Sequence, residues 1–351
     1  YKGLCPFHQE KTPSFNVSPG RQMFHCFGCG EGGDVFTFLM RYEGRTFVDA
    51  VRELGRRFGV DVEERALPPG AVAERKRRQA ERERLLEVME RAAAFYAAEL
   101  ARPSGAPVRR YLASRGITGE AVERFGIGHA PPGWDGLVRG LRDMKVSPAE
   151  AERLGLIVGR RGGGGFYDRL RDRVVFPVAD AAGRVVALGG RVLPGAAEDA
   201  PKYVNSPESP VFSKSRVLYG LDQARGAMRR GEPPIVVEGY LDVIAMHVHG
   251  LASAVAPMGT ALTSEQAALL RRFGDRSRSV ILLFDGDEAG EAAASRAQPA
   301  ISEAGLGARV ALLPAGEDPD SFVRTKGPDS LREIIDSAEG LVEHIIDRAA
   351  S

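Results

Sequence analysis

Two short stretches decide the fold, I-V-V-E-G-Y-L-D at residues 235–242 and V-I-L-L-F-D-G-D at residues 280–287. Each starts as a run of apolar residues and ends on acidic ones, a pattern that predicts a buried strand followed by a loop. Strands are expected at residues 235–237, 251–255, 280–284 and 310–313, with helices between them. Strands that alternate with helices predict a mainly parallel sheet covered by helices on both faces.

Carboxylates follow these strands. Glu238 and Asp285 come directly after the first and third strands, at the edge where open parallel sheets bind ligands. Carboxylates gathered there repel each other unless cations neutralise them, and such oxygen ligands suit Mg²⁺ or Mn²⁺. A single carboxylate is more simply a loop residue or a helix cap, but the set predicts a metal site for phosphoryl transfer. The candidate metal ligands are Glu238, Asp242, Asp285, Asp287, Asp318 and Asp320, and the candidate catalytic residues are Glu238, Asp285 and Asp287.

A second metal site is expected near the start of the chain. The sequence C-P-F-H at Cys5 to His8 is followed, after 17 residues, by C-F-G-C at Cys26 to Cys29. Three thiolates and one imidazole complete a tetrahedral zinc site with no open position, so one structural zinc ion per chain is expected. The three cysteines are odd in number and lie close together, which argues against disulfides. His25 lies outside this spacing and is expected to face away.

The same region mixes cations with aromatic residues. Lys11, Arg21, Phe15 and Phe24 together offer the chemistry that holds phosphates and stacks bases. The alternative is that the phenylalanines form the core of a very small domain. This alternative is favoured for Phe15, and both explanations stay open for Phe24.

The 351 residues suit a multidomain protein. We expect a zinc ribbon, built of a small β-sheet with flanking helices, at residues 1–60, with strands at 14–18 and 22–26. Within it Phe47, Val51, Leu54 and Phe58 predict a helix with one apolar face.

A charged linker helix is expected at 61–105, its charges solvated. The first part of an α/β domain follows at 106–230, with a strand pair near 174–178 and 184–188, then the parallel sheet at 231–320 and further helices at 321–351.

Charge and hydropathy exclude two classes of protein. The 48 lysines and arginines nearly balance 47 acidic residues, so the chain is not a uniformly basic nucleic-acid binder, and any such binding uses local patches. Apolar runs such as residues 280–284 are far shorter than the roughly 20 residues that span a bilayer. We therefore expect a cytoplasmic protein that does not bind membranes.

Several of these motifs resemble one family. C-P-F-H, T-P-S-F at residues 12–15 and F-H-C-F-G-C-G at 24–30 resemble the zinc-binding domain of bacterial replicative primases. E-G-Y-x-D at 238–242 and D-G-D at 285–287 resemble the TOPRIM fold, which primases share with some topoisomerases and nucleases. D-R-V-V-F-P-V at 172–178, G-G-R at 189–191, K-Y-V-N-S-P-E at 202–208 and L-Y-G-L at 218–221 resemble the primase polymerase core.

The resemblance implies a DNA primase, a nucleotidyltransferase that makes short RNA primers from ribonucleoside triphosphates on single-stranded DNA for replication. It implies that the ribbon helps to recognise the template. It also implies a partnership with the replicative helicase, through a C-terminal domain that we expect to be absent, and a monomer. Because Tyr1 stands so close to Cys5, the natural start is expected to be missing too. The groove residues that it implies are Arg191, Lys202, Asn205 and Lys214, with Arg115 and Arg169 as further candidates.

Other functions compete with this interpretation. A topoisomerase requires a nucleophilic tyrosine on a separate domain, which is not evident here, and a nuclease would ignore ribonucleotides. A fused primase-helicase requires a G-x4-G-K-[ST] loop, which the sequence lacks. A non-catalytic, zinc-dependent DNA-binding module would not need the complete set of acidic motif residues.

Overall fold

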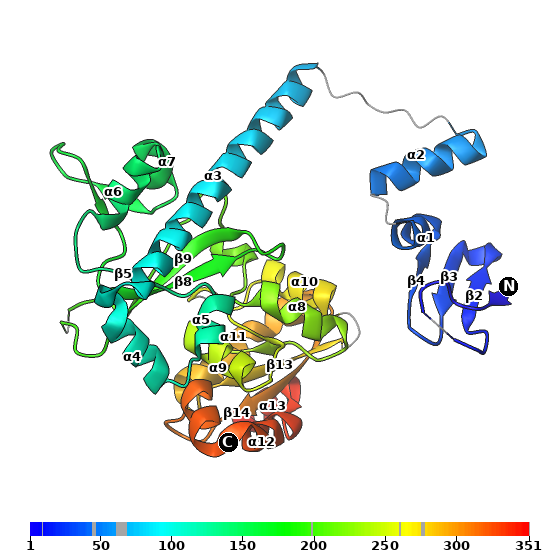
Figure 1. Cartoon of the computed structure of the whole chain (residues 1–351). Helices are drawn as coiled ribbons and strands as arrows, with labels where there is room; N and C mark the ends of the chain where they lie inside the picture. Colours follow the sequence, from blue (N-terminus) through cyan, green and yellow to red (C-terminus); the bar gives the residue numbers. More distant parts are fainter. Residues whose placement is uncertain are drawn as a thin grey trace. The chain divides into compact units, whose positions relative to one another are not determined.

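The computed structural model describes residues 1–8, 10–43, 47–60, 69–197, 199–259, 261–274 and 278–350. The chain divides into two compact units, Tyr1–Lys76 and Arg77–Ser351, which are described separately (Figure 1). The parallel sheet lies in the second unit, and the cysteines lie in the first.

The first unit is a four-stranded antiparallel sheet followed by two helices. Its elements are β1 (Lys2–Gly3), β2 (Phe15–Ser18), the 3-10 turn η1 (Pro19–Arg21), β3 (Met23–Cys26), β4 (Gly32–Asp34), α1 (Val35–Tyr42) and α2 (Phe47–Phe58). The strands expected at residues 14–18 and 22–26 are confirmed. The Asp34 side chain accepts a hydrogen bond from the Thr37 backbone N–H and so caps α1.

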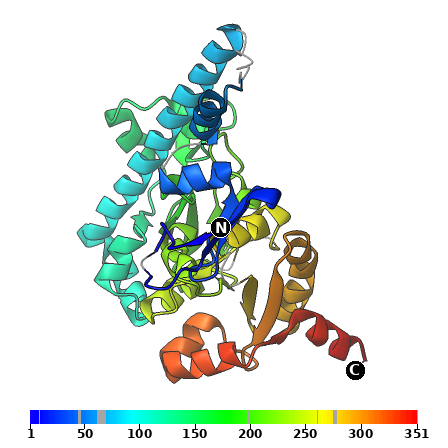
Figure 2. The same ribbon diagram turned by 90° about the vertical axis from the view of Figure 1, so that its right-hand side faces the viewer.

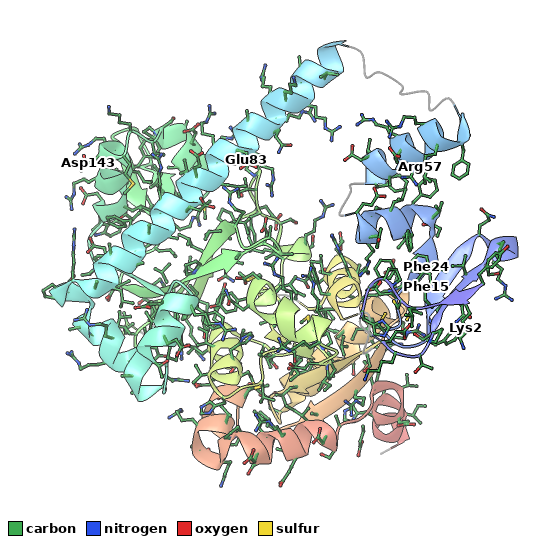
Figure 3. All side chains as sticks on the ribbon, turned by 45° about the vertical axis from the view of Figure 1, so that its right-hand side comes forward. Lys2, Phe15, Phe24, Arg57, Glu83 and Asp143 are labelled. Carbon is green, nitrogen blue, oxygen red and sulfur yellow. The ribbon has the colours of Figure 1, made fainter. Side chains whose placement is uncertain are left out.

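Aromatic side chains make the core of this unit. Phe15 and Phe24 are both buried, and their rings stack with centroids 5.3 Å apart (Figure 3). The question left open for Phe24 is therefore answered in favour of the core. The apolar face expected on α2 is only partly correct: Leu54 is buried, but Phe47 and Phe58 are 57% and 74% exposed. Leu54 instead packs with Ala50 and with Leu39 of α1.

The second unit begins on a long helix and then alternates helices with three sheets. Its first elements are α3 (Pro69–Ala101, which starts before the unit boundary), η2 (Pro103–Gly105), α4 (Ala106–Ser114), α5 (Gly119–Arg124), β5 (Gly128–Ala130), α6 (Gly136–Asp143), α7 (Pro148–Arg153), β6 (Ile157–Gly159), β7 (Phe166–Asp168), β8 (Arg173–Ala179), β9 (Val185–Val192), β10 (Tyr203–Asn205) and η3 (Lys214–Arg216). The expected strand pair is the β8–β9 hairpin, which closes through Asp180 to Gly183.

Two sheets come from this part of the chain. Strands β10, β9, β8 and β5 form an antiparallel sheet in that order, and β6 pairs with β7. The glycine run Gly162 to Gly165 joins β6 to β7, and all four residues have positive φ, which glycine adopts at low cost.

Helix α3 differs from the linker expected at residues 61–105. From Leu85 onward it buries an apolar stripe that includes Met89 and Tyr96 in the core of the second unit. Two of its acidic residues are also paired, since Arg184 donates to Glu83 over 3.0 Å and to Glu90 over 2.5 Å. Figure 1 shows this half of α3 beside β8 and β9. The many charged residues of this helix indicated a solvated linker, and the apolar residues that are spaced to lie on one buried face were not recognised.

The remaining elements build the parallel sheet. They are α8 (Leu221–Arg229), β11 (Ile235–Val236), α9 (Tyr240–Val248), β12 (Ala254–Val255), α10 (Ser264–Phe273), β13 (Ser279–Phe284), α11 (Glu288–Glu303), β14 (Gly307–Leu312), α12 (Pro319–Asp336), β15 (Glu339–Gly340) and α13 (Leu341–Ala350). The strand order is β12-β11-β13-β14-β15, and only β15 is antiparallel to its neighbour. The expected mainly parallel sheet is confirmed.

Both faces of this sheet are buried because its strands alternate between two hydrophobic clusters. Ile281 and Leu283 of β13 pack with residues of α9 and α12, whereas Val280 and Leu282 pack with residues of α8, α10 and α11. Both whole-chain views show α12 on one side of the sheet (Figures 1 and 2). The capping box expected at Thr263 and Gln266 is present at the start of α10. No helix in the described part of the chain has the length and apolarity of a membrane span.

The burial of α3 is testable. Leu86 is fully buried, so Leu86→Ala should lower the unfolding free energy of the second unit by about 2–5 kcal/mol. Trp134, the only tryptophan of the chain, lies in this unit, and its fluorescence in urea reports the unfolding of this unit. Val72 lies earlier on α3 and is 40% exposed, so Val72→Ala should change the free energy by less than about 0.5 kcal/mol. Equally small effects of both changes would mean that the whole of α3 is a solvated linker.

Candidate metal centres and their surroundings

The first centre lies in the ribbon, where one donor atom each from Cys5, His8, Cys26 and Cys29 lies within 4.8 Å of all the others. Cys5 Sγ and Cys29 Sγ are 3.7 Å apart, and Cys26 Sγ is 3.9 Å from His8 Nδ1. A tetrahedron with zinc–sulfur bonds of about 2.3 Å has edges of about 3.8 Å, so these separations suit a zinc ion.

The surroundings of this cluster also suit a metal held by thiolates. The backbone N–H groups of Phe7 and Cys29 point at Cys5 Sγ and Cys26 Sγ, and Cys26 Sγ lies 3.0 Å from Ser14 Oγ. Such donors stabilise thiolate charge and orient the sulfur atoms. His25 is exposed, packs against Phe27 and lies outside the cluster, as expected.

The second centre is the carboxyl edge of the parallel sheet, where two glycines shape the loops. A Cβ atom on Gly286 would lie 1.9 Å from the Leu313 carbonyl oxygen, so only glycine fits between Asp285 and Asp287. A Cβ on Gly239 would lie 2.9 Å from a carboxylate oxygen of Asp242. The close approach at Gly286 holds the loop after β13 against the backbone that follows β14, and the absence of a side chain at Gly239 leaves room for the Asp242 carboxylate.

Like charges crowd this edge. Burial raises the pKa of Asp285 to about 6, and the neighbouring charges of Glu238, Asp318 and Asp287 add to the rise. Burial and the charges of Asp318, Asp285 and Asp320 raise the pKa of Asp242 to about 7. The pKa of Glu238 is also raised, by burial first and by Asp287 second. The six acidic candidates therefore form one connected set, in which Asp285 links Glu238 and Asp287 to Asp242, and Asp242 is the link to Asp320.

Three of the six have a structural task as well. Asp287 Oδ1 accepts a hydrogen bond of 2.8 Å from the Gly290 N–H and caps α11. Asp318 Oδ1 accepts from the Ser321 N–H over 2.6 Å and caps α12. Asp320 is buried and forms an ion pair with Arg115, while its Oδ1 has no hydrogen-bond partner in the described residues. In the described part of the chain, no three acidic side chains bring their oxygens within 4.8 Å of one another.

Candidate groove residues lie next to this edge. Arg191 donates to the Tyr111 hydroxyl, and its guanidinium group lies 5.4 Å from the centre of the Tyr111 ring. Arg115 lies over the same ring at 5.6 Å. Lys202 is exposed, and its charge opposes the rise in the pKa of Asp285. These cations therefore lie close to the carboxylates.

The remaining candidates differ in their placement. Asn205 Oδ1 accepts a hydrogen bond of 2.8 Å from the Tyr240 hydroxyl, in the first turn of α9. Lys214 starts η3, where its backbone N–H donates to Glu208, and Arg169 lies beside Gly155. Neither Lys214 nor Arg169 has an ion pair among the described residues. Four candidates therefore lie near the acidic edge: Arg115, Arg191, Lys202 and Asn205. No contact joins Lys214 or Arg169 to this edge among the described residues.

Sequence reasoning missed Tyr111 and Tyr240, which join the candidate residues to each other. Tyr240 lies inside the quoted E-G-Y-x-D motif, so its position was a signal that went unused. Tyr111 lies 80 residues from Arg191 and carries no comparable signal.

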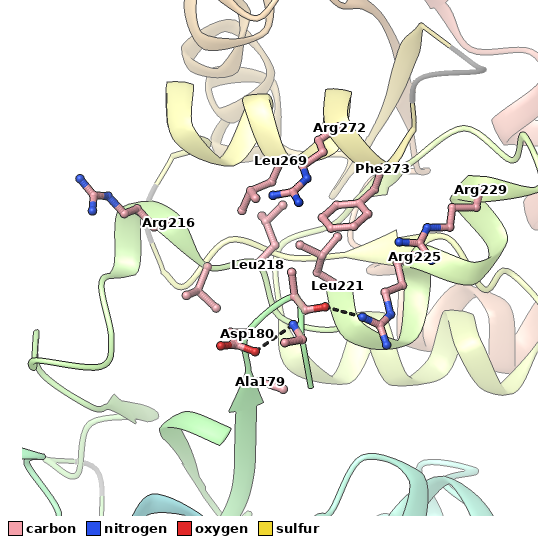
Figure 4. A pocket seen from close by; sticks show the side chains of 13 residues that line it. Ala179, Asp180, Arg216, Leu218, Leu221, Arg225, Arg229, Leu269, Arg272 and Phe273 are labelled. Atoms are coloured by element: carbon pink, nitrogen blue, oxygen red, sulfur yellow. Dashed lines mark hydrogen bonds between the residues drawn. The ribbon is translucent and has the colours of Figure 1, made fainter. Parts of the chain in front are cut away.

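A separate cavity of about 460 Å³ lies at the tip of the β8–β9 hairpin, between η3, α8 and the end of α10 (Figure 4). Leu218, Leu221 and Phe273 are among its apolar lining, and Arg216 and Arg272 are among its cations. Phe273 ends α10, which leads to the amino end of β13, whereas Asp285 follows the carboxyl end of that strand. None of the acidic candidates lines this cavity.

Comparisons with known proteins agree with both centres. Family models match three parts of the chain: a CHC2 zinc finger at residues 1–67, the N-terminal domain of the DNA primase catalytic core at 95–225, and a Toprim-like domain at 235–323. The expected TOPRIM and zinc-ribbon folds are therefore confirmed. A Toprim fold also implies a divalent metal, in accord with the acidic edge.

Relatives cover nearly all of the chain. The DNA primase of Halalkalibacterium halodurans is 44% identical over 334 residues, which are 95% of this chain and 54% of the relative. The chain thus spans about half the length of the curated relatives it matches. A crystal structure of the zinc-binding and RNA polymerase domains of the Aquifex aeolicus primase matches with a TM-score of 0.69 and 35% identity, covering 100% of this chain and 81% of that one.

A primase catalytic domain solved with single-stranded DNA matches with a TM-score of 0.67 and 37% identity, covering 77% of this chain and 86% of that one. Identities of 35% and 37% over most of each solved chain indicate common descent as well as a common fold. The chain described here belongs to the bacterial DNA primase family.

Proposed function

We propose that this chain makes short RNA primers from ribonucleoside triphosphates on single-stranded DNA. The observation that carries the proposal is the crowded carboxylate edge of the Toprim sheet, which shares a chain with the Cys/His cluster. The related catalytic domain bound to single-stranded DNA supports that class of template. Such an enzyme works in chromosome replication, and hence in the bacterial cytoplasm.

The ribbon proposal is that Cys5, His8, Cys26 and Cys29 hold one structural zinc ion. Four protein donors leave no position for substrate, so the ion stabilises the fold. Because the apolar core of this unit is small, metal binding supplies much of its folding free energy. The folded ribbon then presents its exposed cations, Lys11 and Arg21, to the phosphates of the template.

The catalytic proposal is that Glu238, Asp285 and Asp287 hold Mg²⁺ or Mn²⁺, with Asp242 and Asp318 close by. Oxygen donors suit such ions, and the proposal is supported by burial and neighbouring carboxylates, which raise the pKa values of Glu238, Asp242 and Asp285. Bound divalent metal would lower the pKa of the attacking 3′-hydroxyl and neutralise the phosphates. Glu238 keeps solvent access at this edge although part of its carboxyl group is desolvated, and we propose that it accepts the proton of that hydroxyl if it does not hold an ion.

In the reaction the primer 3′-oxygen forms a bond to the α-phosphorus of the incoming nucleotide, and the bond from that phosphorus to the bridging oxygen breaks as pyrophosphate leaves. Lys202 and Arg191 are proposed to hold the phosphates, because arginine and lysine form charge-assisted hydrogen bonds to phosphate oxygens. Arg115 is held by Asp320 and faces the same aromatic ring as Arg191. A preset cation of this kind loses little freedom when phosphate binds.

The zinc proposal predicts the behaviour of two adjacent residues. Cys26→Ser should reduce bound zinc from one ion per chain to none and unfold the ribbon, since a ligand and its folding energy are lost together. Metal analysis and proteolysis of residues 1–60 measure these effects, while unchanged Trp134 fluorescence reports an intact second unit. His25→Ala is the control and should keep its zinc. A Cys26→Ser protein that retains one zinc ion would contradict the assignment.

The catalytic proposal predicts that Asp287→Asn abolishes synthesis without unfolding the protein. Asparagine caps helices as well as aspartate does, so α11 should stay intact. Loss of a charged metal ligand should reduce primer synthesis by about a hundredfold or more. The assay combines the protein with single-stranded DNA, ribonucleotides and Mg²⁺, and measures short RNA.

Asp135 occupies the N-cap position of α6 without a capping hydrogen bond from its side chain, so Asp135→Asn controls for the loss of one carboxylate outside the acidic edge and should synthesise primers at the wild-type rate. Near wild-type synthesis by folded Asp287→Asn protein would exclude Asp287 as a metal ligand. Cleavage of the DNA without RNA synthesis by the unmodified protein would favour a nuclease instead.

A further inference from the structure

Tyr240 connects the parallel sheet of the second unit to the sheet that contains β8, β9 and β10, at the proposed catalytic edge. It starts α9, two residues after Glu238, and its side chain is buried. Its hydroxyl donates a hydrogen bond of 2.8 Å to Oδ1 of Asn205, the last residue of β10. The bond therefore links the motif that carries Glu238 to a strand that carries groove candidates.

Packing fixes the Tyr240 ring on two sides. The ring stacks on Phe176 of β8, with centroids 5.0 Å apart and planes 3° apart. The ring of Tyr219 meets it edge to face at 4.7 Å and 85°. Contacts of these kinds leave the ring little freedom to rotate, so the hydroxyl has one position.

The sheet makes room for that hydroxyl. Gly189 of β9 lies directly opposite Asn205 in the strand register. A Cβ atom on Gly189 would lie 2.4 Å from the Tyr240 hydroxyl, so any side chain there would displace the hydroxyl. Glycine at this position is therefore a requirement of the Tyr240–Asn205 hydrogen bond.

The hydrogen bond sets the direction of the Asn205 amide. Because Oδ1 accepts from Tyr240, the two N–H donors of the amide point away from the tyrosine. They have no hydrogen-bond partner among the described residues, and Nδ2 lies beside Gly259, which has no side chain to cover it. Asn205 thus holds an unused pair of donors in a fixed orientation.

Strand β10 borders the acidic edge. Burial is the main cause that raises the pKa of Tyr203 to about 12, and the charge of Asp242 adds to it. The positive charge of Lys202, which precedes the strand, lowers the pKa of Asp285 and so opposes its rise. Strand β10 is thus within electrostatic reach of Asp242 and Asp285, and Asn205 at its end is bonded to Tyr240, two residues after Glu238.

We propose that Tyr240 is a positioning residue, which holds the Asn205 amide so that its nitrogen donates to an acceptor oxygen of the incoming ribonucleotide. This inference rests on the proposed function. Without the tyrosine hydroxyl the amide is free to rotate and to present its oxygen, which repels the oxygens of phosphate and offers a sugar hydroxyl a different partner. The effect falls on nucleotide binding, since the same hydrogen bond is made in the ground and transition states.

The test compares Tyr240→Phe, Asn205→Ala, the double variant and Tyr219→Phe in primer synthesis. Tyr240→Phe keeps the ring and removes one hydroxyl, so it should raise the ribonucleotide KM roughly tenfold, the equivalent of one hydrogen bond, with a smaller change in kcat. In the Asn205→Ala background the same change should alter KM by less than about twofold. The Tyr219 hydroxyl belongs to the same cluster but has no hydrogen-bond partner in the described residues, so Tyr219→Phe should leave KM unchanged.

A wild-type KM for Tyr240→Phe would overturn the inference. So would an equal loss in the presence and absence of Asn205, or an equal loss in Tyr219→Phe, because either result would mean a general effect on packing. These failures leave wild-type primer synthesis intact and so differ from a failure of the proposed function. If the unmodified chain makes no RNA, binding of a fluorescent ATP analogue to the same proteins provides the comparison, and equal binding by all of them overturns the inference.

Discussion

Repulsion among carboxylates at one edge of the parallel sheet is the constraint on which the rest of the second unit depends. Three strands and their loops converge there, and Asp285 experiences the charges of Glu238, Asp318 and Asp287. The close backbone contact at Gly286 keeps these groups together even though their charges oppose it. We infer that this electrostatic repulsion is retained for a function, because a divalent cation bound between the carboxylates and phosphates would offset it.

The edge is stable because its residues also serve the fold. Asp287 and Asp318 each cap a helix, and Asp320 forms an ion pair with Arg115. These bonds hold the carboxylates in place, so binding of the proposed metal and substrate would need little reorganisation. Tyr240 also has two roles, because its ring packs on Phe176 of β8 and its hydroxyl holds the Asn205 amide.

Local sequence patterns predicted much of this structure, but they did not predict contacts between residues that are far apart in the sequence. The Cys/His cluster follows from the C-x2-H and C-x2-C spacings, because two such motifs within 25 residues are typical of one zinc site. The parallel strands follow from apolar runs that end on acidic residues. By contrast, Arg115 and Asp320 are 205 residues apart, and nothing near either one indicates the other. The core role of α3 was missed because its dense charges concealed the stripe of Leu85, Met89 and Tyr96.

Manganese binding tests the central claim most directly, because it requires neither DNA nor nucleotide. The zinc-loaded chain is titrated with Mn²⁺, and the electron paramagnetic resonance signal reports the free ion. Saturable binding of at least one Mn²⁺ per chain is predicted, with displacement by Mg²⁺ and loss in Asp285→Asn. A signal that rises from the first addition as steeply as in buffer alone would contradict the account, since the carboxylate edge would then hold no metal.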